Sequence, residues 1–316
     1  MATVLISGGT GMVGTALTAS LTRQGHAVIV LVRENSVQRD AGTNSKDSAI
    51  PVRYAKWNVE AGSIDDWAIA EADHIIHLAG ANVAAKRWSA KRKKEIRDSR
   101  VLSGQLLCAA VARVPNKIIS IASASAIGWY GPDAEIPNPQ PFIETDHVYD
   151  DFLGTTCNAW EQSILPMQAM GKRLSILRTG IVLSPDGGAL TEFRQPLRFG
   201  VAAILSNGRQ VISWIHINDL VRLYEAAIFD QTMAGVFNAV TPNPVDNKTL
   251  TLTLARAIRG RAFIPMHVPG FVLKIVLGEM SIEVLKSCTV SANKLSRMGF
   301  QFAYPSIDAA ITSIVQ

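Results

Sequence analysis

Three glycines near the start of the chain, Gly8, Gly11 and Gly14, have the spacing of a turn that binds phosphate. In such a turn the first glycine permits a tight bend, the second lets the backbone approach a pyrophosphate, and the third lets a helix pack closely on the preceding strand. Free N–H groups at the start of that helix would face the anion. The full segment consists of Gly8, Gly9, Thr10, Gly11, Met12, Val13 and Gly14. Because ordinary turns can share this spacing, the flanking elements decide its meaning.

The flanking elements favour a nucleotide site. Residues 4–7 are uncharged and rich in branched apolar side chains, which predicts a buried parallel strand. An amphipathic helix is expected over residues 15–24 and a second apolar strand over residues 27–32. Strand, glycine turn, helix and strand together predict the first βαβ unit of a dinucleotide-binding sheet.

The residue that closes the second strand bears on the choice of dinucleotide. An NAD site usually has Asp or Glu about twenty residues beyond the glycines to bind the ribose 2′-hydroxyl, whereas an arginine accommodates a 2′-phosphate. This chain has Arg33 at that place. A guanidinium matches phosphate in charge and in bidentate geometry, so the sequence favours NADP(H) over NAD. In the alternative interpretation Arg33 is a solvated cation and Glu34 binds the ribose.

The remaining elements alternate between predicted strands and helices. Residues 34–50 are polar and are expected to form a surface loop. Further strands are expected at residues 52–55, 73–80, 117–122 and 173–179, and helices at residues 64–70, 90–112 and 150–169. Ser63 is expected to start the first of these helices, and the pair Asn218 and Asp219 to cap another helix over residues 220–229.

This alternation predicts an α/β fold, a Rossmann-like doubly wound parallel sheet with a smaller C-terminal substrate lobe. The sheet domain is expected to span residues 1–180, with residues 211–240 returning to it. The lobe is expected to comprise residues 181–210 and 241–316.

Composition and charge argue against several classes of protein. Of 316 residues, 48% are hydrophobic, enough for a large core. Because the first strand is predicted almost at Met1 and apolar runs are short, we expect neither a secretory signal nor a membrane span, and therefore a cytoplasmic protein. Three scattered cysteines and six histidines without ligand spacing predict neither disulfides nor a metal site. The outer basic residues between 86 and 100 are expected to form a solvated helix face rather than a nucleic-acid site, whereas the inner ones could serve an anionic cofactor or substrate.

Four segments resemble the extended short-chain dehydrogenase/reductase superfamily. They are the glycine turn, His77-Leu78-Ala79-Gly80, the segment from Ser123 to Gly131, and Trp214-Ile215-His216-Ile217-Asn218-Asp219. Further segments are similar to an atypical epimerase-like family with an extra C-terminal domain of unassigned role, among them Arg87-Trp88, Ser99-Arg100, Trp160-Glu161 and Gly299-Phe300. The resemblance covers essentially the whole chain.

The resemblance implies where the cofactor would lie. NADP(H) would sit on the turn from Gly8 to Gly14, with Arg33 at the 2′-phosphate. Leu78 and Ala79, followed by the small Gly80, would lie beside the adenosine half.

The resemblance also implies contacts from later segments. Arg100 occupies a helix position where ordinary members carry asparagine, and together with Glu95 it would face the cofactor. The backbone of Val182 would meet the nicotinamide end. Glu95 is equally consistent with a salt bridge within its helix.

The chain departs from ordinary members at the catalytic position. They use Tyr-x-x-x-Lys on the helix after the fifth strand, where the lysine lowers the tyrosine pKa and the phenol transfers a proton. None of the five tyrosines here has a lysine four residues later. Counted back from Glu161, the tyrosine and lysine positions fall on Leu153 and Cys157.

Several residues could replace that pair. The candidates are the hydroxyls of Ser123 and Ser125, the phenols of Tyr130 and Tyr149, and the thiol of Cys157. Each also has a structural explanation, as a serine at a strand end, a packed aromatic ring or a small buried apolar group. The serines are preferred because they follow a strand at the ligand side of the sheet.

Two functions are consistent with these residues. The first is an NADP(H)-dependent oxidoreductase or epimerase-like enzyme that acts on an unknown small molecule. The second is a non-catalytic NADP(H)-binding protein that regulates a protein partner, as the loss of Tyr-x-x-x-Lys would permit. A homodimer is possible in either case, and nucleic-acid binding ranks last.

Overall fold

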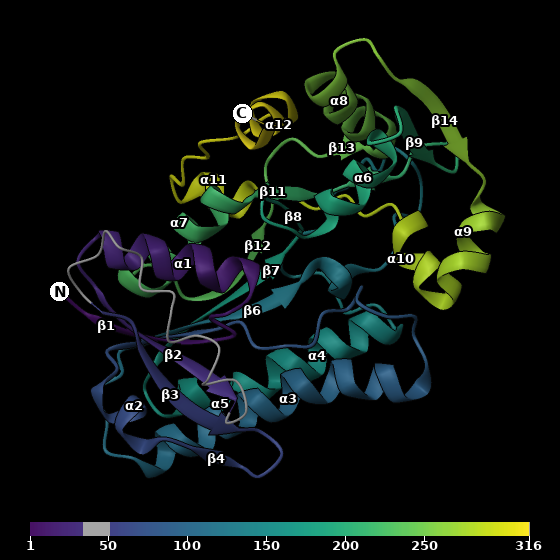
Figure 1. Ribbon diagram of the computed structural model, residues 1–316. Coiled ribbons are helices and arrows are strands. Elements are labelled where there is room, and N and C mark those ends of the chain that lie inside the picture. The colour runs from purple at the N-terminus through teal and green to yellow at the C-terminus, as the bar shows by residue number, and fades with distance from the viewer. Residues whose placement is uncertain (34–50, 316) are drawn as a thin grey trace.

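An eight-stranded sheet forms the centre of the computed structural model, which describes residues 1–33 and 51–315 (Figure 1). In spatial order its strands are β12 (Gly235–Ala239), β7 (Arg173–Thr179), β6 (Ser120–Ala126), β5 (His74–His77), β1 (Thr3–Ser7), β2 (Ala27–Arg33), β3 (Arg53–Asn58) and β4 (Ser63–Ile64). Neighbours pair in parallel except β3 and β4. Because the chain winds outward from β1 in both directions, the strand order reverses between β1 and β5. The predicted doubly wound sheet is confirmed, and its ligand crevice is expected at the carboxyl ends of these two strands.

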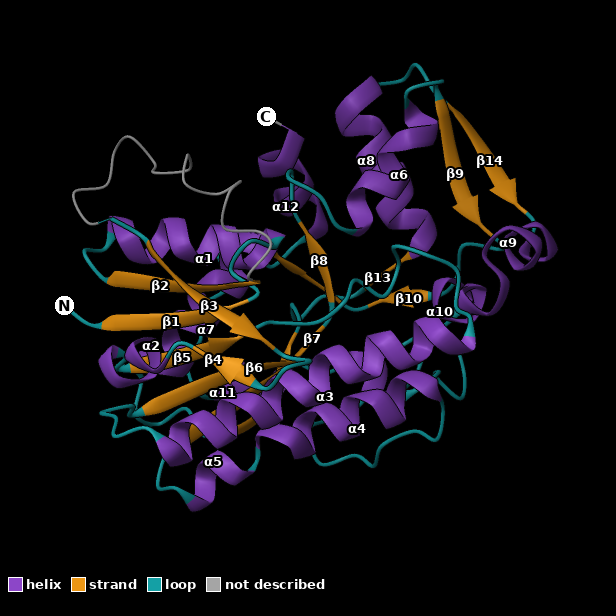
Figure 2. Cartoon of the chain, turned by 60° about the horizontal axis from the view of Figure 1, so that its bottom comes forward, coloured by secondary structure: helices purple, strands orange, loops and turns teal. Residues whose placement is uncertain are grey.

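Helices cover both faces of this sheet, as strands with apolar side chains on both sides require. α1 (Met12–Arg23) and α7 (Ile217–Phe229) pack on one face, where Val4 and Ile6 of β1 are buried. The other face buries Leu5 against α2 (Asp66–Glu71), α3 (Ala90–Arg113), α4 (Phe152–Ile164) and α5 (Pro166–Ala169) (Figure 2). No helix in the two described ranges combines the length and the apolar character that crossing a bilayer requires.

A second lobe is built from segments that leave the carboxyl ends of β7 and β12. It contains α6 (Ala189–Leu197), β9 (Val201–Leu205), β10 (Val211–Ile212), β13 (Val245–Asp246), α8 (Asn247–Arg259), β14 (Ile264–Val268), α9 (Gly270–Leu277), η3 (Gly278–Met280), α10 (Ser281–Leu285) and α12 (Ile307–Val315). α6, α8 and α12 enclose a core of their own that includes Leu190, Leu254 and Ile311.

Four further elements connect the lobe with the sheet. β8 (Ile181–Leu183) follows directly after β7 in the chain and pairs in parallel with β11 (Trp214–His216). The short helix η2 (Ile127–Tyr130) continues from β6. α11 (Asn293–Arg297) returns to the sheet half, where its Leu295 joins the core under α1 and α7. The last part of the chain therefore contributes to both cores.

Several element boundaries differ from those predicted. β6 runs to Ala126 instead of ending at residue 122, so both candidate serines lie inside the strand. Ser63 does not start a helix, because it pairs with Asn58 in an antiparallel turn of sheet and α2 begins at Asp66. The predicted helix over residues 150–169 is divided at Pro166, which has no N–H to donate to the carbonyl four residues earlier. The predicted loop over residues 34–50 lies outside the described residues.

The start of α7 also differs from the prediction. His216, not the pair Asn218 and Asp219, caps the helix, and its Nδ1 accepts a hydrogen bond from the backbone N–H of Asn218 at 3.1 Å. Asp219 is fully buried and accepts hydrogen bonds from the backbone N–H groups of Ala303 (2.8 Å) and Tyr304 (2.9 Å). The carboxylate thus fastens a segment near the C-terminus to α7.

We predict that Asp219→Ala lowers the free energy of unfolding by about 3 kcal/mol, because it leaves two N–H groups without their charged acceptor. Urea denaturation would measure the loss. Asp308→Ala is the matched control, since Asp308 is an exposed aspartate on α12 and its removal should change stability by less than about 0.5 kcal/mol. Equal stability of the two variants would contradict the anchoring role of Asp219.

Candidate functional site

Backbone atoms pack closely around the glycine turn between β1 and α1. A side chain at Gly8 or Gly14 would therefore displace them. Gly8 has φ +72°, and a Cβ there would lie 2.9 Å from the carbonyl carbon of Leu78. A Cβ on Gly14 would lie 2.4 Å from the carbonyl oxygen of Gly8. Gly11 is the N-cap residue of α1 and provides no side-chain cap, and the first turn of the helix contains no acidic residue. The N–H groups and the positive end of the helix dipole are therefore available to an anion.

The segment after β5 lies directly beside this turn. The backbone N–H of Leu78 donates to the carbonyl of Ser7 at 3.0 Å, which continues the pairing of β1 with β5. A Cβ on Gly80 would come 3.0 Å from Cζ of Arg100. The predicted contact segment around Ala79 is thus confined between the glycine turn and α3.

The segment from Val182 to Gly188 approaches the same turn from the side of the second lobe. Val182 lies in β8 and pairs with Ile215. A Cβ on Gly188 would lie 3.3 Å from Sδ of Met12, the first residue of α1. The structure therefore brings the turn and the start of the second lobe into contact.

Arg33 and Glu95 are close enough to influence each other electrostatically. Arg33 is exposed at the carboxyl end of β2. The pKa of the Glu95 carboxyl is lowered by its hydrogen bond with Arg92, and the charges of Arg92, Lys86 and Arg33 add to this effect. Glu95 forms an ion pair with Arg92 at 2.7 Å and is more than half exposed. The salt bridge that the sequence allowed within this helix is therefore present, and it lies in a strongly basic neighbourhood.

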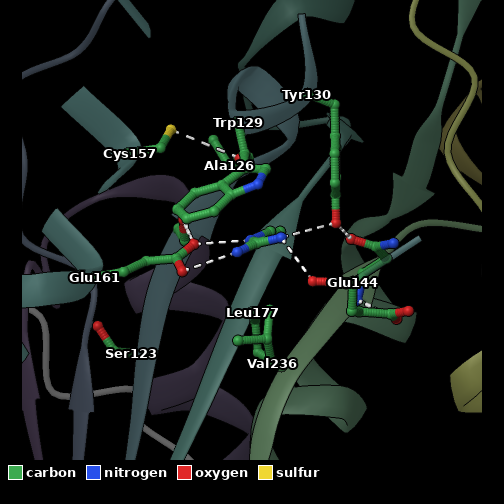
Figure 3. A network of polar contacts seen from close by, with 12 residues as sticks. Ser123, Ala126, Trp129, Tyr130, Glu144, Cys157, Glu161, Leu177 and Val236 are labelled. Carbon is green, nitrogen blue, oxygen red and sulfur yellow. Dashed lines mark hydrogen bonds and ion pairs between the residues drawn. The ribbon is translucent and has the colours of Figure 1, made fainter. Parts of the chain in front are cut away.

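The most extensive polar network at this end of the sheet is centred on Arg178 of β7 (Figure 3). Its Nε and Nη2 donate to the two carboxylate oxygens of Glu161, on α4, at 2.8 and 3.0 Å. Both side chains are almost fully buried. The guanidinium also lies 3.6 Å from the ring centroid of Trp129. A bidentate pair of this kind satisfies both charges without solvent.

Two of the candidate catalytic residues belong to this network. Ser125 donates to Oε1 of Glu161 at 2.7 Å. The Tyr130 hydroxyl donates to Oδ1 of Asn238 at 2.6 Å and accepts from Nη1 of Arg178 at 3.1 Å. Burial raises the pKa of Tyr130 to about 12. Both hydroxyl protons are therefore held by buried acceptors of the protein itself.

The other candidates are placed differently. Ser123 is buried in β6, and its Oγ makes a 3.3 Å contact with the carbonyl of Ala124 next to it. The Cys157 thiol donates to the carbonyl of Ala126 at 3.6 Å, and burial raises the pKa of this thiol to about 12. Tyr149 is 45% exposed. Within residues 1–33 and 51–315, no group of His, Cys, Asp or Glu side chains is arranged to hold a metal ion.

Sequence reasoning did not single out Arg178 or Asn238. The available indication was an arginine near the end of an otherwise apolar strand, in the run Arg173-Leu174-Ser175-Ile176-Leu177-Arg178. A charged residue in a buried strand requires a buried partner. Which residue supplies that partner depends on the packing of α4 on the sheet.

Fold and turn together define a dinucleotide-binding protein of the Rossmann type. The profile of the NAD dependent epimerase/dehydratase family matches residues 4–239, and a domain of unknown function, DUF1731, matches residues 268–314. The chain belongs to the NAD dependent epimerase/dehydratase family. The predicted resemblance to epimerase-like proteins with an extra C-terminal domain is thereby confirmed.

Individual proteins agree with this assignment over nearly the whole chain. The epimerase family protein Mb2239 of Mycobacterium bovis is 34% identical, over 98% of this chain and 96% of its own length. The crystal structure of the human epimerase family protein SDR39U1 (isoform 2) with NADPH superposes with a TM-score of 0.83 at 28% identity and covers 99% of both chains. A nucleoside-diphosphate sugar epimerase from Corynebacterium glutamicum gives 0.76 at 31% identity, over 99% of this chain and 58% of its own.

We predict that Arg178→Met lowers the free energy of unfolding by about 3–5 kcal/mol, because it leaves the buried Glu161 carboxylate without its partner. The double variant Arg178→Met with Glu161→Met should regain most of this loss, since it removes both buried charges. Chemical denaturation of the two single variants, Arg178→Met and Glu161→Met, and of the double variant would measure the coupling. If the two losses were simply additive, the ion pair would not be the stabilising feature of the network.

Proposed function

We propose that this chain is an NADP(H)-dependent oxidoreductase or epimerase-like enzyme that acts on a small molecule between the carboxyl edge of the sheet and the second lobe. The observation that carries the proposal is the position of Arg33, which ends β2 beside the glycine turn where an NAD site would have an acid. The close packing at Gly8 and Gly14 supports a tight phosphate-binding turn, because an added Cβ would meet the backbone of Leu78 at the first position and the carbonyl oxygen of Gly8 at the second. The NADPH in the structure of the human relative supports the same cofactor.

In this proposal the chain holds the dinucleotide along the crevice between β1 and β5. The turn from Gly8 to Gly14 binds the pyrophosphate and Arg33 binds the 2′-phosphate. Leu78, Ala79 and Gly80 lie beside the adenosine half. Glu95 and Arg100 face the cofactor from α3, and the backbone of Val182 meets the nicotinamide end.

We predict that the native chain binds NADPH with micromolar affinity and NADH much more weakly, and that Arg33→Ala removes most of this difference because the 2′-phosphate loses its guanidinium. Calorimetry would measure the four dissociation constants. Arg53→Ala is the matched control, since Arg53 is a surface arginine on the adjacent strand at the opposite end of the sheet, where it pairs with Glu71. An unchanged preference in Arg33→Ala would refute the assignment of Arg33.

The bound nicotinamide would supply or accept the hydride, so the chain has to orient the substrate, exclude water and polarise the reacting group. Ser123 is the first candidate for polarisation, because the only hydrogen bond of its side chain within the described residues is the long contact with the adjacent carbonyl. Ser125 is the second, since its proton is held by Glu161. Tyr130, which was also a catalytic candidate, would act by keeping Arg178 in place.

A second function is favoured by the chemistry of α4. This helix contains neither tyrosine nor lysine. With the Tyr130 phenol at a pKa of about 12, the nearby acid/base groups are poorly matched to neutral pH. The alternative is therefore a non-catalytic NADP(H)-binding protein that regulates a protein partner.

We predict that Ser123→Ala combined with Ser125→Ala abolishes NADPH oxidation on any carbonyl substrate found in a screen, while NADPH binding is retained. Ser120→Ala is the control, because Ser120 is a buried serine at the opposite end of β6 whose hydroxyl donates a hydrogen bond to the carbonyl of Ile228. Full turnover in the double variant would exclude the serines. Tight NADPH binding without turnover on a broad panel would favour the regulatory function.

We also propose the division into a nucleotide-binding domain, residues 1–180 with 211–240, and a substrate lobe, residues 181–210 with 241–316. The separate core around Leu190, Leu254 and Ile311 supports the lobe. The three cysteines, all free and buried, are compatible with a cytoplasmic protein.

A further inference from the structure

The two-stranded sheet of β9 and β14 in the second lobe has one buried face and one outward face. Side chains alternate between the faces of a strand, and the register places Val201 of β9 beside Ile264 of β14. Ala202 and Ile204 of β9 point inward, where they are almost fully buried. The residues of the outward face are all apolar, and each is exposed or half-buried. They are Val201, Ala203, Leu205, Ile264, Met266 and Val268. Because a sheet face toward water usually carries polar side chains, this face is an exposed apolar patch.

Phe199 and α9 extend the patch beyond the two ends of this sheet. Phe199 precedes β9, and α9 follows directly after β14 with all eight of its residues exposed or half-buried. Apart from Met1, the four most exposed large apolar side chains in the described part of the chain lie in this region. They are Phe199, Ile264, Phe271 and Ile275, which are between 65% and 87% exposed. Figures 1 and 2 show β9, β14 and α9 together at the end of the molecule away from the large sheet.

The charges of this region all have one sign. Residues 194–205 and 256–277, which we call the outer flank, include six lysines and arginines but no aspartate or glutamate. The six cations are Arg194, Arg198, Arg256, Arg259, Arg261 and Lys274. None of them takes part in an ion pair with another described residue. Of the acidic residues next to the flank, Glu279 pairs with Lys93 of α3, and Glu192 lies in the first turn of α6, at the opposite end of this helix from Arg198.

Two of the six cations stabilise helix ends. Arg259 donates to the carbonyls of Leu197 at 2.9 Å and Arg198 at 2.6 Å, and Arg194 donates to the carbonyl of Ile314 at 3.2 Å. Because a helix C-terminus carries only about half a negative charge, these contacts compensate part of the two guanidinium charges and no more.

Three other cations border the apolar patch. Arg198, Arg261 and Lys274 are all exposed. The two arginines precede β9 and β14, at one end of the sheet, and Lys274 lies in α9 at the other end. The outer flank therefore combines exposed apolar side chains with positive charge at both ends.

This combination identifies the class of partner. A second copy of the chain docked symmetrically on the flank would oppose cations with cations. Strand pairing along β14 is hindered too: the N–H of Ile264 donates to the carbonyl of Gly200 at 2.8 Å, so the next residue, Pro265, faces the free edge and has no N–H to offer. An anionic lipid bilayer complements both features, because it has phosphate groups at its surface and hydrocarbon directly beneath them.

We propose that the outer flank of the second lobe binds the surface of an anionic lipid bilayer. Phe199, Phe271 and Ile275 enter the boundary between headgroups and acyl chains, while Arg198 and Arg261 contact lipid phosphates. Attachment of this kind requires no spanning helix, since the apolar face lies in the plane of the interface. The inference is independent of the proposed function, because the flank lies apart from the glycine turn.

The test is co-sedimentation of the full chain with two kinds of vesicle, pure phosphatidylcholine and phosphatidylcholine with about one third phosphatidylglycerol. The chain should sediment with the anionic vesicles and much less with the neutral ones. Raising the salt concentration should weaken the binding, because salt screens the attraction between the cations and the lipid phosphates.

Variants of the apolar patch test insertion. Phe271→Ser and Ile275→Ser should each weaken binding to the anionic vesicles by about tenfold, because each removes an apolar side chain that enters the bilayer. Ile119→Ser is the matched control, since Ile119 is 60% exposed but precedes β6 in the large sheet, and it should leave binding unchanged. Thermal unfolding should be the same in Phe271→Ser, Ile275→Ser and the native chain, because both side chains are exposed.

Variants of the cations test the choice of lipid. Arg198→Gln combined with Arg261→Gln should weaken binding to the anionic vesicles by about tenfold or more and leave binding to the neutral ones unchanged. Arg297→Gln is the matched control, since Arg297 is an exposed arginine of α11, outside the flank, and it should weaken neither.

Three results would overturn the proposal: no co-sedimentation of the native chain, equal binding to both kinds of vesicle, or unchanged binding in Phe271→Ser and Ile275→Ser. Sedimentation velocity without lipid supplies a fourth. If the native chain formed a dimer that Phe271→Ser dissociated, the flank would bind a second copy of the chain and not a bilayer.

Discussion

The buried guanidinium of Arg178 is the constraint on which the ligand end of this fold depends. A charge inside a protein must be matched by charge and hydrogen bonds, and removing one partner leaves a large penalty. Here the partners come from separate parts of the chain: Glu161 from α4, Trp129 and Tyr130 from η2, and the carbonyl of Glu144 from the following loop. The requirement therefore fixes how α4 and η2 sit against the carboxyl ends of β6 and β7 (Figure 3).

The network also explains why this end of the sheet can be both polar and rigid. Ser125 and Tyr130 donate into it, and Asn238 of β12 accepts from the tyrosine hydroxyl. The backbone N–H of Asn238 in turn donates to Oε1 of Glu144 at 3.0 Å. Fully satisfied polar networks of this kind hold one arrangement, because any alternative leaves a buried group without a partner. The strand ends are thus held in place before any ligand arrives.

Arg100 and Arg178 lie at one edge of the sheet, but the partners of their guanidinium groups differ. Arg178 has a bidentate carboxylate, whereas Arg100 has only backbone carbonyls and an aromatic face. The first arrangement contributes to a unique fold, and the second leaves a positive potential beside Gly80 and the glycine turn. The two arginines at this edge of the sheet therefore differ in local charge balance, since a carboxylate compensates only Arg178.

The sequence by itself determined the sheet order near β1, the glycine turn and the family, because these depend on local patterns. A branched apolar run, three spaced glycines, an amphipathic helix and a second apolar strand predict a βαβ unit without reference to distant residues. The predicted span of β7 coincides with the observed one. The predicted end of β6 was wrong because its pairing with β7 extends the strand to Ala126, and a distant partner is not visible in a local pattern. The predicted role of Ser63 was wrong because Ser63 pairs with Asn58 of β3 instead of starting a helix.

Only the tertiary structure decided which polar residues meet. Asp219 was expected to cap α7, yet its carboxylate binds backbone N–H groups more than eighty residues away, and His216 caps the helix instead. Glu161 was known only as a position in a motif, and the packing of α4 on β7 gave it Arg178 as a partner. The physical reason is that periodicity specifies which face of an element is buried, whereas compensation of a buried charge depends on which elements pack together.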